Sequence, residues 1–372
     1  MPASKTNHDQ RFMSLALTLG RRGFGNTWPN PSVGAVVVRH DGAEPVIVGR
    51  GWTQPGGRPH AETEALRRAG PAARGATLYV TLEPCSHHGK TPPCTDAIIA
   101  AGIARVVSAI EDPNALAGRG HALLRASGVT VDVGVGAAEA QRAHAGHVRS
   151  VCDHRPHISL KLAVSADGKA GRAGRKPAPI TGEAARARVH MMRAMNDAIL
   201  IGIGTALADD PQLTCRLPGM APRSPVRVVL DTGLRLPATG ALVRSASETP
   251  VWVIAGESAP AEAEAVLAAR RVEVFRVPAT GGRLDIAAVL RVLDDRRVTR
   301  LMVEGGPIVA AAFLAADLVD EAVLLRGPNP IGPDGIDALE AMPLTALTDS
   351  PRLRSRGIET VGEDTIETFE RS

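Results

Sequence analysis

Three residues near the amino-terminal end have the types and the spacing of a catalytic zinc site. His60 stands in the segment His60-Ala61-Glu62, and Cys85 and Cys94 follow, each directly after a proline. One imidazole and two thiolates leave the fourth position of a tetrahedral Zn²⁺ ion open for water, which is typical of a catalytic site. The pattern predicts a centre that activates water.

Glu62 lies two residues after the histidine, where its carboxyl group can reach a water molecule on the metal. In zinc deaminases of bases such a glutamate is not a ligand. It moves a proton from water to the ring nitrogen and to the leaving ammonia. The predicted reaction is the hydrolytic removal of an exocyclic amine, with Glu62 as the catalytic residue.

The alternative is that these residues are an unrelated buried histidine and two inert core thiols. The order of the motifs and the irregular segment between the cysteines argue against it. His87 and His88 lie in that segment. A tetrahedral site with three ligands and water has no room for them, so we expect them in the loop, around the metal ligands or against the substrate.

The length and composition predict two domains in a cytoplasmic protein. A chain of 372 residues is too long for one ordinary core. The net charge is +4, no basic run occurs and only 2% of the residues are aromatic, which argues against a nucleic-acid platform and favours a small anionic substrate. Four cysteines form no disulfide framework, and no apolar run approaches the length of a membrane span.

Hydrophobic periodicity places the zinc motif in an α/β domain that we expect at residues 1–148. The pattern predicts helices at 9–22, 60–69 and 95–101 and strands at 33–38, 45–51, 77–81, 106–110 and 129–133. A segment rich in Ala, Gly and His separates it from a second domain at 154–372. In the first domain, both metal-binding segments are thus predicted at the starts of helices, 60–69 and 95–101, where the helix dipole favours thiolate.

The second domain alternates strands and helices, which predicts a mainly parallel sheet. Strands are expected at 157–163, 198–203, 226–230, 251–255, 272–277 and 301–303, and helices at 184–195, 261–269 and 308–318. The strand–glycine–helix unit at 301–318 is a candidate site for a cofactor phosphate, although a plain tight turn is the alternative. The segment at 202–207 lacks the third glycine of a dinucleotide fingerprint, and we expect no helix after it.

These motifs together resemble those of one family, the bifunctional riboflavin-biosynthesis deaminase/reductases. The resemblance covers nearly the whole chain. It rests on Trp28-Pro29-Asn30-Pro31, Pro59-His60-Ala61-Glu62, the segment 81–94, Ser165-Ala166-Asp167-Gly168-Lys169, Leu207-Ala208-Asp209-Asp210-Pro211 and Val303-Glu304-Gly305-Gly306-Pro307.

The resemblance implies a cytidine-deaminase-like α/β/α sandwich followed by a dihydrofolate-reductase-like α/β domain. The first would use Zn²⁺ to deaminate a diamino-ribosylamino-pyrimidinone 5′-phosphate. The second would use NADPH to reduce the ribosyl group of the product to ribityl. It further implies a small-molecule substrate, no nucleic acid, no membrane, and a homo-oligomer formed through the reductase domain.

The resemblance also implies the substrate and cofactor contacts. Asn30 would hold the pyrimidine in the deaminase. The substrate contacts of the reductase would be Lys161, Arg193, Leu213, Arg216 and Glu304. Its cofactor contacts would be Ala163, Thr205, Asp209, Gly306, Pro307, Ile308, Val309, Ala310, Ala311 and Ala312. The alternatives for two of these are a solvated charge on a helix for Arg193 and a turn former for Asp209.

One segment departs from the family pattern. Pro177 and Pro179 stand where the family usually has a serine that touches substrate and a tryptophan that touches cofactor. The loss of an aromatic surface predicts weaker NADPH binding. Two alternatives follow: an active deaminase joined to a weak, inactive or repurposed reductase, and, from another class, an RNA-binding module that edits tRNA bases.

Overall fold

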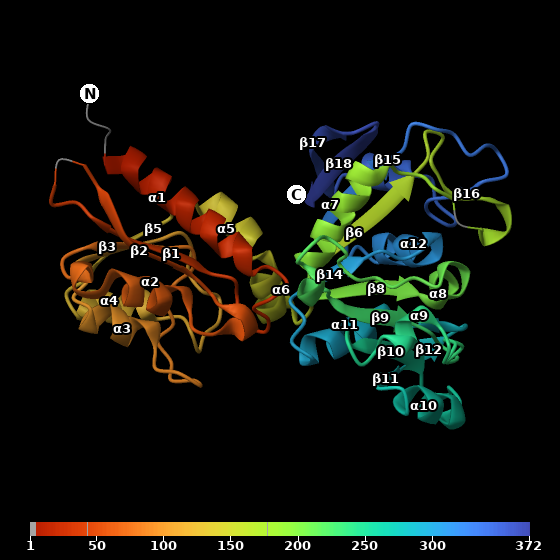
Figure 1. The fold of residues 1–372 in the computed structure, drawn as a ribbon, viewed down its shortest axis with the longest axis horizontal. Coiled ribbons are helices and arrows are strands. Elements are labelled where there is room, and N and C mark those ends of the chain that lie inside the picture. The colour runs from red at the N-terminus through yellow and green to blue at the C-terminus, as the bar shows by residue number, and fades with distance from the viewer. Residues whose placement is uncertain (1–4, 43, 177) are drawn as a thin grey trace. The chain divides into compact units, whose positions relative to one another are not determined.

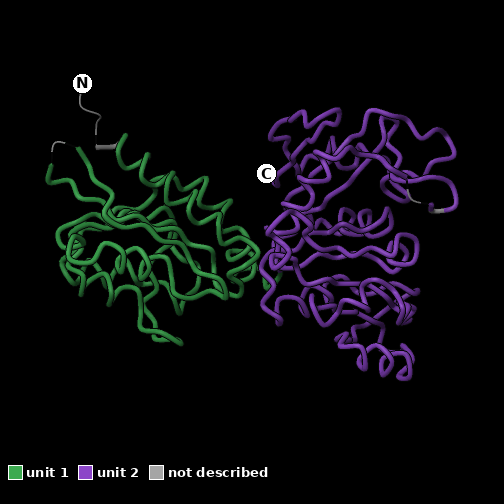
Figure 2. The backbone as a smooth tube through the Cα atoms, in the orientation of Figure 1, with its two compact units in different colours: residues 1–155 green, residues 156–372 purple. Residues whose placement is uncertain are grey.

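Two large sheets organise the chain, one in residues 1–155 and the other in residues 156–372 (Figure 2). The computed structural model describes residues 5–42, 44–176 and 178–372. Helix α6 (Ala145–Asp153) continues past residue 148, the predicted end of the first domain, and belongs to the first unit. No helix in these described ranges is long and apolar enough to cross a membrane.

The sheet of the first unit has five strands in the order β2-β1-β3-β4-β5. Strand β1 pairs antiparallel with β2 and β3, whereas β3, β4 and β5 run parallel. The strands are β1 (Gly34–Arg39), β2 (Val46–Trp52), β3 (Thr77–Val80), β4 (Arg105–Ser108) and β5 (Thr130–Val133). Each lies within a residue or two of its predicted position.

Helices cover both faces of this sheet, as the α/β/α prediction requires (Figure 1). Helices α1 (Lys5–Gly20) and α5 (Ala137–Ala143) pack together on one face. The other face carries α2 (Ala61–Ala69), α3 (Cys94–Ala100) and α4 (Gly120–Ala126). Fully buried side chains of the central strands, such as Val36, Leu78 and Val106, form the core between them.

The sheet of the second unit has nine strands in the order β11-β10-β9-β8-β14-β6-β15-β18-β17. All strands that precede β18 in this sheet order run parallel to one another. Strands β18 and β17 form an antiparallel hairpin at the edge. The strands are β6 (His157–Val164), β8 (Ala198–Gly202), β9 (Val226–Leu230), β10 (Val251–Gly256), β11 (Val272–Val277), β14 (Arg300–Val303), β15 (Glu321–Arg326), β17 (Leu353–Val361) and β18 (Asp364–Arg371).

Most connections between these strands contain a helix, as the alternating pattern predicted. The helices are α7 (Glu183–Ala194), α8 (Ile203–Asp209), α9 (Ala241–Arg244), α10 (Ala261–Ala268), α11 (Ile286–Asp295), α12 (Pro307–Ala315) and α13 (Thr345–Thr348). Short strand pairs join β7 (Lys169–Gly171) to β16 (Ile336–Asp337) and β12 (Ala279–Thr280) to β13 (Arg283–Leu284).

Two expectations for this unit need correction. Helix α8 begins at Ile203, directly after β8, where the sequence argued against a helix. The apolar side chains of Ile203 and Ala206 are buried, and this packing outweighs the weak helical pattern. Strands β15, β17 and β18 were not predicted. Strand β17 is exposed along nearly its whole length, so it has no alternation of buried and exposed residues to reveal it.

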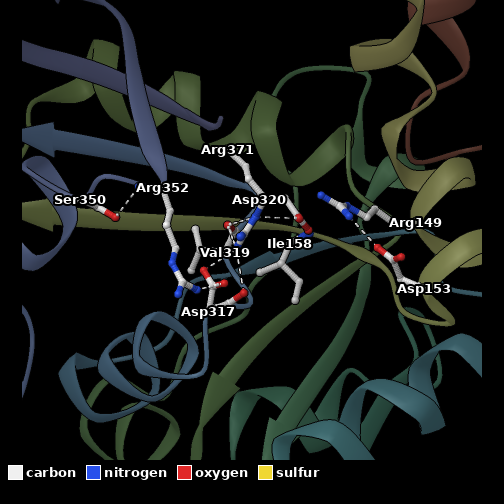
Figure 3. A network of polar contacts seen from close by, with 9 residues as sticks. All are labelled: Arg149, Asp153, Ile158, Asp317, Val319, Asp320, Ser350, Arg352 and Arg371. Atoms are coloured by element: carbon white, nitrogen blue, oxygen red, sulfur yellow. Dashed lines mark hydrogen bonds and ion pairs between the residues drawn. The ribbon is translucent and has the colours of Figure 1, made fainter.

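Arg371 anchors the carboxyl-terminal hairpin to the sheet (Figure 3). Its Nη2 donates to Asp317 Oδ1 at 3.0 Å and to Val319 O at 2.8 Å. Asp317 also pairs with Arg352, which directly precedes β17. Asp320 accepts a hydrogen bond from Ile158 N at 3.0 Å at the start of β6. The network connects β18 to the loop before β15.

Candidate active sites

The three predicted zinc ligands lie together where β3 leads into the helical layer. His60 directly precedes α2, Cys85 lies in the loop after β3, and Cys94 is the first residue of α3. Their ligand atoms lie within 4.8 Å of one another. Nδ1 of His60 is 3.3 Å from Cys94 Sγ and 3.7 Å from Cys85 Sγ. A tetrahedral zinc ion holds such atoms about 3.5 Å apart, so these residues fit the metal.

The two thiols differ in acidity. The hydrogen bond from the Cys94 thiol, reinforced by His60, lowers the pKa of Cys85 to about 4. The backbone N–H of Cys94 also donates to Cys85 Sγ at 3.4 Å. The hydrogen bond to Cys85 and burial raise the pKa of Cys94 well above its ordinary value. Cys85 is therefore the more acidic of the two thiols, and zinc binding would require the loss of the proton of Cys94.

Glu62 lies fully buried in the first turn of α2, within hydrogen-bonding reach of the Cys94 thiol. Burial raises the pKa of its carboxyl group. A carboxyl group of this kind beside a metal centre can accept and return a proton near neutral pH. On the other edge of the imidazole, Asn30 Nδ2 lies 3.4 Å from His60 Nε2 and donates to Gly57 O at 2.7 Å. Both predicted residues border the centre.

Arg58 is a charged neighbour of this centre that the sequence reasoning did not single out. The hydrogen bond to Cys85 raises the pKa of His60, and the charge of Arg58 opposes that rise. The guanidinium Nη1 donates to Thr91 Oγ1 at 2.6 Å, which attaches Arg58 to the loop between the two cysteines. Its place two residues before the histidine was the signal that could have found it.

Three further residues lie close to the zinc ligands in the sequence: His87, His88 and Glu83. Among the described residues the metal-ligating group comprises His60, Cys85 and Cys94, so His87 and His88 lie outside it. Glu83, two residues before the first cysteine, is buried, and it was not predicted. Its carboxylate accepts hydrogen bonds from Asp112 N at 3.1 Å and His121 N at 2.8 Å. It attaches the loop after β4 to the loop that carries Cys85.

In the second unit, Lys161, Arg193 and Glu304 form a nearly buried ion cluster. Arg193 Nε and Nη2 lie 3.0 and 2.9 Å from Glu304 Oε2, and Lys161 Nζ lies 3.2 Å from Oε1. The side chains are 11%, 12% and 14% exposed for Arg193, Glu304 and Lys161, so Arg193 is not a solvated surface charge. Burial alone would raise the pKa of Glu304, but the two cations outweigh it and the pKa is lowered.

The loop after α8, which contains the predicted residues Leu213 and Arg216, is bound to this cluster through Thr214. The Arg216 side chain is exposed, and its Nη1 lies 3.4 Å from Gln212 Oε1. The carbonyl oxygen of Thr214 accepts a hydrogen bond from Arg193 Nη1 at 3.2 Å and lies 3.1 Å from His190 Nδ1. Leu213, buried before it, has a φ of 56°, a left-handed conformation that a branched side chain adopts only when its surroundings hold it. Arg216 follows in the same turn. The loop is thus fixed against helix α7.

The family models and the relatives of this chain cover both units. The cytidine and deoxycytidylate deaminase zinc-binding region matches residues 6–110, and the RibD C-terminal domain matches residues 156–366. Riboflavin biosynthesis protein RibD of Escherichia coli (strain K12) is 39% identical over 368 residues, which cover 96% of this chain and 97% of that protein. The chain belongs to the RibD family.

Other RibD proteins agree over their full length. RibD of Aquifex aeolicus (strain VF5) is 38% identical over 364 residues and covers 98% of each chain. The crystal structure of a diaminohydroxyphosphoribosylaminopyrimidine deaminase/5-amino-6-(5-phosphoribosylamino)uracil reductase from Thermotoga maritima has a TM-score of 0.85 at 34% identity and covers 99% of both chains. Acinetobacter baumannii RibD (form 1) has a TM-score of 0.86 at 32% identity, covering 99% of this chain and 100% of that one. The predicted fold class is confirmed.

The glycine turn after β14 packs closely against α12 and α8. A Cβ atom on Gly305 would lie 2.6 Å from Val309, and one on Gly306 would lie 3.0 Å from Thr205 Oγ1. Thr205 Oγ1 accepts a hydrogen bond from Gly306 N at 3.1 Å, and Pro307 begins α12. The backbone N–H groups of the first turn of α12 therefore lie at the carboxyl end of β14, as an anion site requires.

The remaining predicted cofactor residues differ in how exposed they are to solvent. Ile308 is exposed and Val309 and Ala312 are half-buried, whereas the side chains of Ala310 and Ala311 are buried in the core. Only the backbone of those two alanines remains for a ligand. Asp209 is the exposed last residue of α8, and Ala163 lies on β6, two residues after Lys161.

A cavity of about 210 Å³ lies just beyond β6, next to the segment in which RibD proteins usually have the aromatic residue. Its walls are Ser165, Arg172, Ala178, Pro179, Ile180, Asn329, Pro330 and Ile331. Pro179 thus borders this cavity. Pro177 lies outside the described residues.

Proposed function

We propose that His60, Cys85 and Cys94 hold the zinc ion of a pyrimidine deaminase, and that the Glu304 cluster binds the substrate of a reductase in the same chain. The chain is a bifunctional enzyme of riboflavin biosynthesis, with zinc and NADPH as its cofactors. We assign deamination to residues 1–148 and reduction to residues 154–372. The observation that carries the proposal is the buried Glu62 carboxyl group beside a three-ligand zinc site.

In the deaminase, a bound zinc ion would activate a water molecule for attack on the ring carbon that carries the amine. Glu62 takes one proton of that water and gives it to the ring nitrogen, and then takes the remaining proton of the added hydroxyl group and gives it to the departing amine. Burial raises the pKa of its carboxyl group, which suits a group that accepts and donates in turn. The C–N bond breaks, a carbonyl group forms and ammonia leaves. Asn30, beside His60, orients the pyrimidine with its amide group.

In the reductase, bound NADPH would supply a hydride for the anomeric carbon of the ribosyl group, while the ring C–O bond at that carbon breaks and its oxygen takes up a proton from solvent. Lys161 and Arg193 hold the carboxylate of Glu304 in place, and Glu304 orients the sugar. Arg216, which follows Thr214 in the loop, binds the substrate phosphate, because a guanidinium group can bind two phosphate oxygens at once. Arg193 adds its positive charge and an N–H beyond those that it donates to Glu304 and Thr214. Leu213 packs against the substrate beside them.

Incubation with the diamino-ribosylamino-pyrimidinone phosphate, with and without NADPH, tests the proposal by mass spectrometry. We expect the deaminated product in both samples and the ribityl product only with NADPH. Deamination alone would refute the reductase assignment and favour a repurposed second domain. A zinc-loaded protein that leaves the substrate unchanged would refute both assignments.

We further propose that the enzyme works in the cytoplasm on this small molecule, without nucleic acid, and pairs with a second copy through the reductase domain. The four cysteines are free thiols, which suits a reducing compartment. The edge strand β17 has exposed residues on both faces, among them Ile358 at 67% exposure. Light scattering of Ile358→Lys tests the pairing, since a charge there should produce monomers if β17 forms the contact.

A further inference from the structure

His190 stands at the centre of the substrate side of the reductase, although neither the sequence motifs nor the proposed mechanism uses it. It lies on α7, one turn before Arg193, and is half-buried. Its Nδ1 atom lies 3.1 Å from Thr214 O and 3.4 Å from Arg216 N. Thr214 and Arg216 belong to the turn that presents the predicted phosphate ligand. The imidazole therefore contacts both Thr214 and Arg216 in that turn.

The two contacts of Nδ1 require different protonation. Thr214 O is an acceptor, so it needs a proton on Nδ1, whereas the backbone N–H of Arg216 is a donor and needs a lone pair there. A neutral ring can satisfy only one of them at a time. A protonated ring donates from Nδ1 to Thr214 O at all times, and the N–H of Arg216 becomes available for another acceptor. Protonation of His190 thus changes what Arg216 can bind.

The surroundings of His190 lower the pKa of its imidazole in the absence of a ligand. Burial lowers the pKa of the imidazole, and the cationic side chains of Arg193 on α7 and Arg216 in the turn lower it further. The hydrogen bond with Thr214 O and the carboxylate of Glu304, after β14, oppose them, and Glu304 is already bound by Arg193 and Lys161. An anion held by the two arginines would cancel the charges that depress this pKa.

We propose that His190 takes up a proton when the substrate phosphate binds to Arg193 and Arg216, and so acts as a third cation that strengthens phosphate binding. The inference rests on the proposed reductase function, in which those two arginines hold the phosphate. With both ring nitrogens protonated, Nδ1 always donates to Thr214 O, and the N–H of Arg216 turns to a phosphate oxygen. His190 is a positioning residue that acts through the Thr214–Arg216 turn.

The direction of the pH dependence follows from linkage. Because the pKa of His190 is higher in the complex than in the free enzyme, substrate binding weakens as the pH rises from the free pKa through the pKa of the complex. A rise of about one pKa unit on binding corresponds to about a tenfold change in affinity. The step from substrate complex to product involves no proton of His190, so the effect belongs to KM and not to kcat.

Steady-state reduction between about pH 5 and pH 8 tests this inference. The enzyme, His190→Gln and Arg188→Gln are compared at saturating NADPH. Glutamine retains a polar group of similar reach but does not titrate. Arg188 is a matched control because it lies on the same helix and pairs with Glu359. Ionisation of the substrate phosphate, with a second pKa of about 6, affects the three proteins alike.

We expect KM of the enzyme and of Arg188→Gln to rise with pH about three- to tenfold more than KM of His190→Gln. The three kcat values should agree within about twofold at each pH, since His190 does not touch the reacting atoms. Parallel KM profiles for the enzyme and His190→Gln would overturn the inference. A fall in kcat with unchanged KM would also overturn it.

Calorimetric titration with ribose 5-phosphate separates this inference from the proposed function. Repeating the titration in buffers of different ionisation enthalpy counts the protons taken up on binding. We expect more proton uptake by the enzyme than by His190→Gln, and equal uptake, or no binding, would refute the role of His190. A complete absence of reduction in the kinetic assay would instead refute the reductase function, whatever the calorimetry finds.

Discussion

Replacement of Glu304 by glutamine tests how far the reductase site depends on its ion cluster. The carboxylate lies 2.9 Å from Arg193 Nη2 and 3.2 Å from Lys161 Nζ, and the three side chains are at most 14% exposed. At an effective dielectric constant of about 20, two charges about 3 Å apart attract by about 5 kcal/mol. Desolvation of the carboxylate cancels several kcal/mol of that attraction.

Glu304→Gln leaves two nearly buried cations without an anion, for which a loss of about 3–5 kcal/mol is typical. We expect this variant to lose about 3 kcal/mol of stability, because the glutamine oxygen still accepts a hydrogen bond. Hydrogen exchange of peptides from β6, β8 and β14, followed by mass spectrometry, measures the opening free energy of this sheet within the full chain. Reduction should be lost in the same variant.

The control for this variant is Glu359→Gln, which breaks the ion pair with Arg188 in which the glutamate side chain is 56% exposed. An exposed pair contributes about 0–1 kcal/mol, so this variant should exchange nearly as the parent does. If Glu304→Gln destabilises the sheet no more than Glu359→Gln does, the cluster does not hold the site together. The reasoning from burial and charge would then be wrong.

The pH provides a second control on the same residue. The pKa of Glu304 is lower in the folded protein than its ordinary value. Its carboxylate therefore contributes stability above the unfolded pKa of about 4.3, and that contribution is lost as the pH falls through the lower folded pKa. The difference between the parent and Glu304→Gln should accordingly be full at neutral pH and shrink in acid. A difference that is constant down to acid pH would contradict the electrostatic origin.

Three further predictions concern the metal centre and the cofactor. Glu62→Gln should retain a full equivalent of zinc by metal analysis but lose deamination, because its ligands are intact and its proton acceptor is gone; normal turnover would contradict the role of Glu62. Cys94→Ser should lose both zinc and deamination, and a fully loaded variant would show that the ligand is another residue. Pro179→Trp should bind NADPH about fivefold more tightly by fluorescence titration, since an aromatic contact contributes about 1 kcal/mol, whereas Pro179→Leu should not.

The zinc site could be predicted from the sequence because its residues lie in short motifs at helix starts. The spacing of His60, Glu62, Cys85 and Cys94 determined which groups could meet a metal ion. The local strand–loop–helix geometry then brings them within 4.8 Å. Arg58 and Glu83 were not predicted as site residues, because each is a single charged residue outside the ligand pattern. Their contacts depend on how the surrounding loops fold.

The sequence by itself determined the types of the ligands, the alternation of strands and helices, and the glycine turn before α12. Only the tertiary structure decided which charges of the reductase are neighbours. Strand β14 comes late in the sequence, but in the sheet it lies between β8 and β6. This order brings Glu304 next to Lys161, which lies 143 positions earlier. Such pairing depends on the packing of a parallel sheet with long crossovers, and no local pattern of residues encodes it.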